Sequence, residues 1–233
     1  MHSSTQRTRT NMQNYALITN DDLIENPSPR CPCMVILDTS GSMDGAPIMQ
    51  LNEGMQHFMQ SLQQDDMAAC SVEVSVITAG GQVIEQLPFT TAMSIDQISH
   101  FSATGGTPIG EAVRLGLQRL EERKQTYRKN GVAYYQPWLV IISDGAPTDE
   151  WRSSAAQSQG LSQQQKLVVL PIGVAGANLN VLAQFSAKPA LKLDGLKFNE
   201  FFEWLSASMS RVSASASTSS TVQLPPTSGW NSI

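Results

Sequence analysis

A short apolar run ends abruptly in oxygen-bearing side chains, and this junction constrains the fold more than any other part of the chain. Residues 34–37 are Met-Val-Ile-Leu, and Asp38, Ser40 and Ser42 follow at alternate positions. The uninterrupted apolar run predicts a buried strand. In an open α/β sheet, ligands bind at the carboxyl ends of such strands. We therefore expect these three side chains at a ligand-binding edge of a sheet.

The rest of the chain alternates strand-like and helix-like segments. Strands are expected at 33–38, 72–78, 83–87, 139–142, 167–173 and 190–193. Helices are expected at 46–64, 94–100, 108–128, 149–164, 178–186 and 199–212. Because Gly80-Gly81 forms a turn, the segment 83–87 should return antiparallel as an edge strand. The pattern predicts an α/β fold: a doubly wound, mostly parallel sheet of about six strands, with one antiparallel edge strand and helices on both faces.

Composition divides the chain into three parts. Residues 1–31 are polar and include Asn26-Pro27-Ser28-Pro29, which predicts an N-terminal arm. Residues 32–212 carry the alternating pattern and form the predicted domain, which is of ordinary size for one domain. Residues 213–233 are rich in Ser and Thr and are predicted to be a flexible C-terminal tail.

Charge and apolar patterning exclude several classes of protein. A net charge of −5 argues against nucleic-acid binding, which needs a basic face. No apolar stretch approaches ~18 residues, so we expect no transmembrane helix and no membrane partner. The N-terminus has no apolar core and does not resemble a secretory signal. Cys31, Cys33 and Cys70 have no metal or redox spacing and are expected to be reduced thiols, which fits a cytoplasmic protein.

Two later positions complete the group of oxygen donors. Thr107 precedes the helix expected at 108–128, and Asp144 follows the strand expected at 139–142. In a doubly wound sheet, these loops meet the first loop at the carboxyl ends of the strands. Carboxylate and hydroxyl oxygens suit Mg²⁺ or Mn²⁺, or Ca²⁺, and do not suit Zn²⁺. The sequence therefore predicts a metal site made by Asp38, Ser40, Ser42, Thr107 and Asp144.

The predicted donor set leaves room for one more ligand. Two carboxylates balance the charge of one divalent cation, and three hydroxyls add neutral oxygens. Mg²⁺ prefers octahedral coordination and usually keeps several waters. At least one position is therefore open, and a Glu or Asp of a partner protein is the expected occupant. Asp149 and Glu150 lie nearby in sequence and are expected in the first turn of the next helix, where the helix dipole favours acidic residues; a position on the rim of the binding face is the alternative.

The five donors and their order resemble a known family signature. Asp38-Thr39-Ser40-Gly41-Ser42, Thr107 and Asp144 are similar to the DxSxS…T…D pattern of the von Willebrand factor A domain, called the metal-ion-dependent adhesion site. The resemblance covers about residues 32–212. It implies a doubly wound fold, a divalent cation and a non-enzymatic protein-binding function. It also implies that Ser40, Ser42 and Thr107 are hydroxyl ligands, with Asp38 and Asp144 binding the ion directly or through water.

A narrower resemblance points to one bacterial subfamily. The motifs that carry it are Asp38-Thr39-Ser40-Gly41-Ser42-Met43, Gly105-Gly106-Thr107-Pro108-Ile109-Gly110, Ser143-Asp144-Gly145-Ala146-Pro147-Thr148-Asp149 and Phe201-Phe202-Glu203-Trp204-Leu205-Ser206. They look like the TerY-type proteins, which are linked to tellurium resistance and to stress or phage-defence clusters. Those proteins are often encoded with a protein kinase and a PP2C-type phosphatase. The resemblance implies such a kinase or phosphatase as a partner.

Catalysis is the main alternative. A haloacid-dehalogenase nucleophile would need a second Asp at position 40 as acid and base, and this chain has Ser40. A serine hydrolase would need a His partner, and none lies in a matching loop. We therefore expect no catalytic residue. A Mg²⁺-dependent phosphohydrolase and a scaffold with a vestigial metal site remain as alternative functions.

Overall fold

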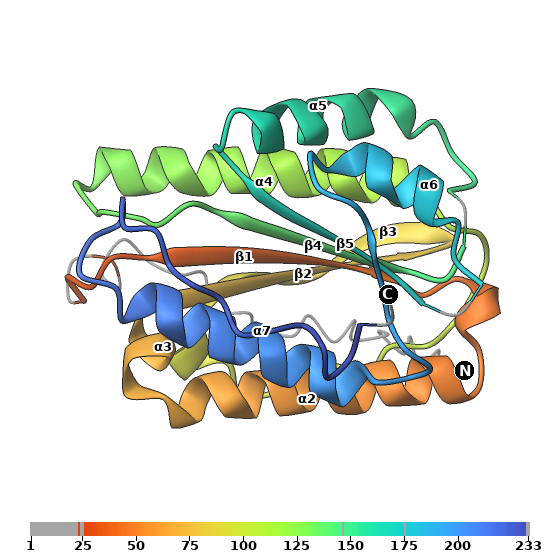
Figure 1. The fold of residues 1–233 in the computed structure, drawn as a ribbon, viewed down its shortest axis with the longest axis horizontal. Coiled ribbons are helices and arrows are strands. Elements are labelled where there is room, and N and C mark those ends of the chain that lie inside the picture. The colour runs from red at the N-terminus through yellow and green to blue at the C-terminus, as the bar shows by residue number, and fades with distance from the viewer. Residues whose placement is uncertain (1–22, 24–25, 146, 175, 232–233) are drawn as a thin grey trace, which may run out of the picture.

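The computed structural model describes residues 23, 26–145, 147–174 and 176–231, and these form one six-stranded sheet between two layers of helices (Figure 1). The strands lie in the order β3-β2-β1-β4-β5-β6. Their bounds are Cys31–Asp38 (β1), Val72–Gly80 (β2), Gln82–Thr91 (β3), Trp138–Ser143 (β4), Val168–Gly173 (β5) and Leu191–Lys192 (β6). Only β3 runs antiparallel to its neighbour within this part of the chain. The predicted fold class is confirmed.

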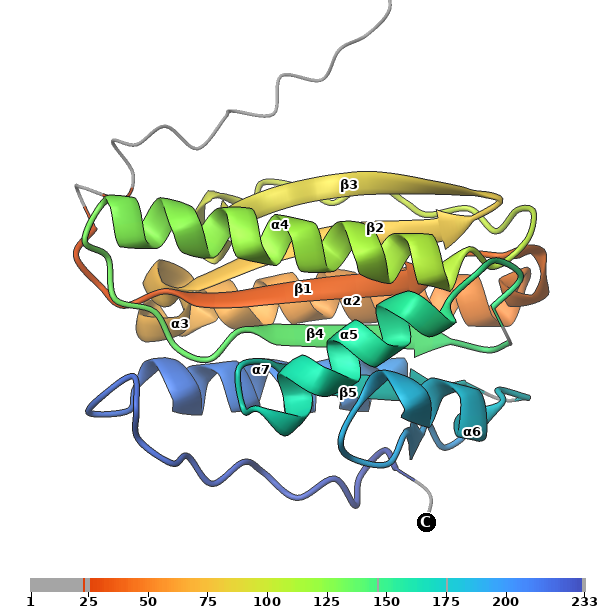
Figure 2. The same cartoon turned by 90° about the horizontal axis from the view of Figure 1, so that it is seen from above.

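The helices cover both faces of the sheet. One face carries α2 (Ala46–Gln64), α3 (Asp66–Ser71) and α7 (Phe198–Ser213). The other carries α4 (Ile109–Lys129), α5 (Arg152–Gln163) and α6 (Leu179–Leu182) (Figures 1 and 2). Short 3-10 turns lie at Gly41–Met43, Ala92–Ser94 and Ala183–Phe185. No helix among the described residues combines the length and apolar character needed to cross a membrane.

The central strand β1 is buried along its whole length because it faces a separate core on each side. Val35 and Leu37 pack in the core beneath α2 and α7. Met34 and Ile36 pack in the core beneath α4 and α5. Successive side chains of a strand point to opposite faces, so both parities must be apolar. This explains the uninterrupted apolar run and places its last residue, Asp38, at the carboxyl edge of the sheet.

The chain between β3 and α4 differs from the prediction. The helix expected at 94–100 is wrong: after the 3-10 turn at Ala92–Ser94, residues 95–108 cross the molecule without regular structure. The side chain of Asn52 on α2 donates to Phe101 O and accepts from Phe101 N, at 2.9 and 2.8 Å. Gln63 Nε2 donates to the carbonyls of Ala92 and Ile95. Side chains of α2 therefore bind backbone groups at both ends of the segment in which the helix was expected.

A short helix was not expected at α3, and α5 begins later than predicted. Asp65 caps α3 because its Oδ1 accepts from Ala68 N at 2.9 Å. The helix expected from residue 149 starts at Arg152. Glu150 stays outside that helix and accepts a hydrogen bond from Arg152 N at 3.0 Å. Asp149 therefore does not lie in the first turn of α5.

The chain after α7 packs against the domain. Trp230 is 1% exposed, and its ring contacts those of Phe201 and Trp204 on α7. Trp204 Nε1 donates to Pro225 O, and Asp194 N donates to Trp230 O. Figure 2 shows this C-terminal segment running alongside α7. The predicted boundaries at residues 31 and 213 stay a prediction, and most of the predicted N-terminal arm lies outside the described residues.

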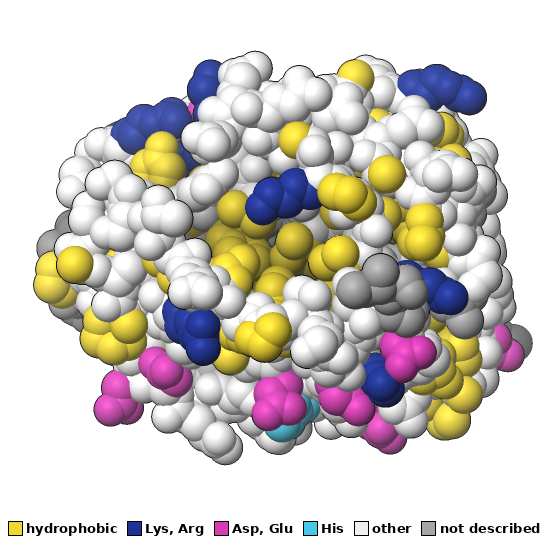
Figure 3. Space-filling view, in the orientation of Figure 1, with side chains coloured by type: hydrophobic (Ala, Val, Ile, Leu, Met, Phe, Trp, Pro, Cys, Tyr) yellow, Lys and Arg dark blue, Asp and Glu magenta, His cyan; other side chains and the backbone are white. Residues whose placement is uncertain are grey.

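A groove lies between the C-terminal segment and the sheet. Its volume is about 570 Å³, and it appears in Figure 3 as a hollow lined by hydrophobic side chains. Its lining includes Tyr135, Trp138, Val168 and Leu224. The C-terminal segment thus forms part of the surface of the domain.

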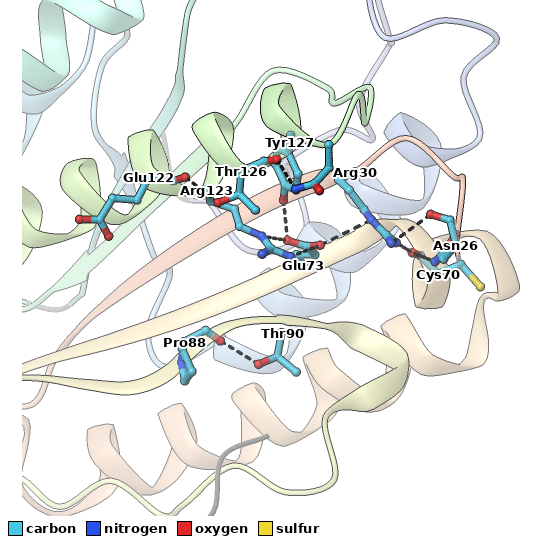
Figure 4. A network of polar contacts seen from close by, with 11 residues as sticks. Asn26, Arg30, Cys70, Glu73, Pro88, Thr90, Glu122, Arg123, Thr126 and Tyr127 are labelled. Atoms are coloured by element: carbon cyan, nitrogen blue, oxygen red, sulfur yellow. Dashed lines mark hydrogen bonds and ion pairs between the residues drawn. The ribbon is translucent and has the colours of Figure 1, made fainter. Parts of the chain in front are cut away.

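A buried network of charged side chains lies at the amino ends of β1 and β2, opposite the edge of the sheet where Asp38 lies (Figure 4). Glu73, at the start of β2, is fully buried. Its carboxylate accepts from Arg123 Nε at 2.6 Å and Nη2 at 2.7 Å, and from the hydroxyl of Tyr127. Arg30 Nε lies 3.5 Å from Glu73 Oε1, and Arg30 Nη1 donates to Cys70 O. The network joins β2 to α4, α3 and the segment that enters β1.

Burial and the negative charge of Glu73 keep the Tyr127 hydroxyl and the Cys31 thiol protonated. Burial raises the pKa of Tyr127 well above its usual value, and Glu73 raises it further. The same two causes raise the pKa of Cys31 to about 12. The Tyr127 hydroxyl therefore keeps its proton and donates a hydrogen bond to Glu73. Cys31, Cys33 and Cys70 are free among the described residues.

Replacing Glu73 with Gln should destabilise the protein by about 3–5 kcal/mol, because two arginines would remain buried without a carboxylate. Urea denaturation measures the loss. The control is Glu122→Gln, which removes an exposed carboxylate from Arg119 and should cost less than ~1 kcal/mol. Equal losses in the two variants would contradict a structural role for the network.

Candidate metal centre

Asp38 is fully buried at the end of β1, and both of its carboxylate oxygens are held. Ser40 N donates to Asp38 Oδ1 at 2.9 Å. Ser143 Oγ donates to Asp38 Oδ2 at 2.6 Å. These bonds come from the loop after β1 and from the end of the neighbouring strand β4. They fix the orientation of the carboxylate.

Two hydrogen-bonded hydroxyls connect Ser40, whose backbone N–H binds this buried carboxylate, with Asp144 nearer the surface. Ser40 Oγ and Ser42 Oγ lie 3.0 Å apart. Ser42 Oγ in turn donates to Asp144 Oδ1 at 2.8 Å. Ser40 is buried, Ser42 is exposed and Asp144 is of intermediate exposure. The structure therefore brings four of the five predicted donors together at one edge of the sheet.

The fifth predicted donor, Thr107, lies in a loop that is bound to its neighbours through backbone. Gly41 N donates to Gly105 O, Thr104 N to Thr39 O and Gly81 N to Gly106 O, at 2.8–3.0 Å. A Cβ on Gly145 would stand 4.0 Å from Thr107 Oγ1, so this hydroxyl faces the loop that carries Asp144. All five predicted donors gather at this edge, and their role as ligands stays a prediction.

One glycine is required for this approach. Gly105 has a φ of +66°, which side chains rarely adopt, and a Cβ there would lie 2.5 Å from Gly81 Cα. The turn between β2 and β3 therefore touches the Thr107 loop directly. Only glycine permits this contact without moving one of the two backbones.

The surroundings of the candidate centre make it unfavourable for Asp144 to carry its negative charge. Burial raises the pKa of Asp144 above its ordinary 3.8, the hydrogen bond from Ser42 opposes the rise, and the negative charge of Asp38 adds to it. No Lys or Arg in the described part of the chain forms an ion pair with either carboxylate. A divalent cation would supply the missing positive charge, so the residues present fit such an ion.

The donor chemistry narrows the kind of ion. Among the described residues, no group of three or more His, Cys, Asp or Glu is placed to hold a metal. A metal at this edge would thus depend on hydroxyl oxygens as well as on the two carboxylates. Hard oxygen donors of this kind suit Mg²⁺, Mn²⁺ or Ca²⁺.

Ser143 belongs to the candidate centre, because it binds the Asp38 carboxylate, and the sequence did not single it out for this contact. Leu37 pairs with Ile142 in the parallel register of β1 and β4, so Ser143 follows directly beside Asp38. The signal in the sequence was a hydroxyl at the end of a buried strand, immediately before Asp144. It became meaningful only once the register of the two strands was known.

Comparison with known proteins finds a family model that matches most of the chain. Residues 34–203 match the family model described as the von Willebrand factor type A domain. No curated protein matches the chain.

Three solved structures illustrate the shared fold. The pilus adhesin SpaC from Lactobacillus rhamnosus GG has a TM-score of 0.64 at 12% identity, covering 78% of this chain and 30% of that one. A von Willebrand factor type A protein from Catenulispora acidiphila has a TM-score of 0.57 at 14% identity, covering 78% and 43%. Proximal thread matrix protein 1 from the mussel byssus, whose metal-ion-dependent adhesion motif is occupied by zinc, has a TM-score of 0.54 at 16% identity, covering 78% and 46%. The chain thus spans less than half the length of each of these structures.

The raised pKa of Asp144 predicts an unusual effect of its removal. In EDTA near neutral pH, Asp144→Asn should have a higher Tm than wild type. Because the pKa of Asp144 is higher in the folded protein than in the unfolded chain, protonated Asp144 contributes stability at pH values below the unfolded pKa. This stability is lost as the pH rises through the folded pKa. The advantage of the variant should therefore shrink on acidification. Thermal denaturation in EDTA across the acidic range measures it.

The control for this measurement is Asp44→Asn, which changes an exposed carboxylate in the neighbouring loop. Its Tm should stay close to that of wild type over the same range. An Asp144→Asn variant less stable than wild type near neutral pH would contradict the prediction.

Proposed function

This chain belongs to the von Willebrand factor type A family, and we propose that it is a non-enzymatic protein-binding module with a metal-ion-dependent adhesion site. The observation that carries the proposal is the meeting of two carboxylates and three hydroxyls from three loops at one edge of the sheet. The matched region contains all five residues.

We propose that Asp38, Ser40, Ser42, Thr107 and Asp144 hold Mg²⁺, or Mn²⁺ or Ca²⁺ in its place. The bound ion would supply an open coordination position that attracts a carboxylate. The chain's own residues prepare this position. The Ser143 hydroxyl and the backbone N–H of Ser40 fix the Asp38 carboxylate. The exposed Ser42 hydroxyl donates to Asp144. The exposure of Ser42 supports access from outside.

The proposed partner is a protein that offers a Glu or Asp side chain. A carboxylate binds a hard cation well, and a cation balanced by only two carboxylates accepts a third. Nucleic acid is a poor candidate because the chain has a net charge of −5. A metal-bridged contact of this type needs no catalytic residue on either side.

The narrower assignment rests on the subfamily motifs. We propose that the chain is a cytoplasmic TerY-type protein of a tellurium-resistance, stress or phage-defence system. Its partner would then be a protein kinase or a PP2C-type phosphatase. The motifs at residues 38–43, 105–110, 143–149 and 201–206 support this assignment. We further propose that residues 32–212 form the binding domain.

Partner capture tests the proposal. Immobilised full-length protein should retain a partner from a lysate of its native host in Mg²⁺, release it in EDTA and regain it when Mg²⁺ is restored. Asp38→Ala and Thr107→Ala should retain at least ~10-fold less, because each removes an oxygen donor. Mass spectrometry and quantitative blotting of the eluted partner measure the difference.

The matched control for capture is Asp44→Ala, which removes an exposed carboxylate from the same loop and should bind like wild type. Partner binding that persists in EDTA and in Asp38→Ala would overturn the metal-bridged function. Turnover of a phosphate ester that is lost in Ser40→Ala would instead support the phosphohydrolase alternative.

A further inference from the structure

A residue outside the five donors binds the backbone of Thr107. Thr148 Oγ1 accepts a hydrogen bond from Thr107 N at 2.9 Å. Thr148 N donates to Thr107 O at 3.0 Å. Both polar backbone groups of Thr107 are therefore bound by one residue, which lies in the segment that follows Asp144.

The next residue, Asp149, caps helix α4 from the same side. Its Oδ1 accepts from Gly110 N at 3.1 Å, and its Oδ2 accepts from Glu111 N at 2.7 Å. The N–H groups of a first helical turn have no partner within the helix. The N-cap of α4 is Pro108, which offers no side-chain hydrogen bond. A carboxylate from another loop thus supplies the cap, in the place that the helix dipole favours.

Two glycines bring these segments into direct contact. A Cβ on Gly110 would lie 2.4 Å from Glu150 O, and one on Gly106 would lie 3.0 Å from Thr148 Oγ1. No side chain fits at Gly110 unless a backbone moves. The segment 148–151 therefore lies against residues 106–111 on both sides of Thr107.

We propose that Thr148 and Asp149 are positioning residues that hold Thr107 in place relative to Asp144 and thereby set the affinity of the centre for Mg²⁺. This inference rests on the proposed metal-binding function. Mg²⁺ demands near-ideal octahedral geometry with short bonds, whereas Ca²⁺ accepts longer bonds and irregular geometry. Loosening the Thr107 loop therefore penalises Mg²⁺ more than Ca²⁺.

Isothermal titration of the full-length protein with MgCl₂ and with CaCl₂ tests the inference. Thr148→Val keeps the shape of the side chain and removes the acceptor for Thr107 N. Asp149→Asn keeps one acceptor oxygen and removes the charge. Each variant should bind Mg²⁺ about 10-fold more weakly than wild type, with a smaller loss for Ca²⁺. In contrast to Thr148→Val, Thr148→Ser should keep wild-type affinity because it keeps the hydroxyl.

Two matched controls separate positioning from general stability. Asp65→Asn alters an equivalent carboxylate cap, on α3. Thr126→Val removes a hydroxyl that donates to Glu122 O within α4. Both controls should leave the ratio of Mg²⁺ to Ca²⁺ affinity unchanged, even where Asp65→Asn lowers the Tm.

The outcomes distinguish the two levels of the proposal. Wild-type protein that binds neither ion overturns the proposed function and this inference together. Wild-type binding with unchanged Mg²⁺ affinity in both variants overturns the inference alone. Equal losses for Mg²⁺ and Ca²⁺ also overturn it, because a merely less stable fold would lose both. If one variant fails to fold by circular dichroism, the titration of the other decides.

Discussion

The burial of β1 on both faces is the constraint on which the rest of the structure depends. Its alternate side chains belong to two different cores, one beneath α2 and α7 and one beneath α4 and α5. A shift of one residue would exchange the two faces and would move Asp38 away from the end of the strand. Asp38 also needs Ser143 beside it, which the pairing of β1 with β4 supplies. Core packing therefore sets the position of the first carboxylate of the candidate centre.

The carboxylates at the two ends of the sheet have opposite surroundings. At the amino end, Glu73 is surrounded by Arg30, Arg123 and the Tyr127 hydroxyl, so its charge and its lone pairs are satisfied within the protein. At the carboxyl end, Asp38 and Asp144 receive hydroxyl and backbone donors, and no cationic side chain of the described chain pairs with them. The first arrangement pairs the buried carboxylate with charged partners of the same chain. The second keeps an unneutralised negative charge near the surface, which is the condition for binding a cation.

The sequence predicted features that depend on local pattern and missed those that depend on contacts between distant segments. Hydrophobic periodicity predicted α2 at 46–64, as observed, and the order of strands and helices followed from the same signal. The helix expected at 94–100 is absent, and side chains of α2 bind the backbone at both ends of this segment: Gln63 binds that of Ile95, and Asn52, 49 positions away, binds that of Phe101. Asp149 was expected to start its own helix, yet it caps α4 across 39 positions. No local pattern encodes such partners, so the contacts of Ser143 with Asp38 and of Thr148 with Thr107 were not predicted, although both residues lie in a motif that the sequence analysis named.

In the proposed function, the hydroxyls of this centre affect how strongly it would hold a partner. Two carboxylates and one divalent cation sum to zero charge, and three hydroxyls leave that sum unchanged. An incoming carboxylate would therefore be drawn by one exposed coordination position, and long-range attraction to a net positive site would contribute little. Affinity then depends on how well the donors are already in place before the partner arrives. The backbone contact of Gly105 with Gly81, and the hydrogen bond from Thr107 N to the Thr148 hydroxyl, would serve this preorganisation, because they fix the loops without adding charge.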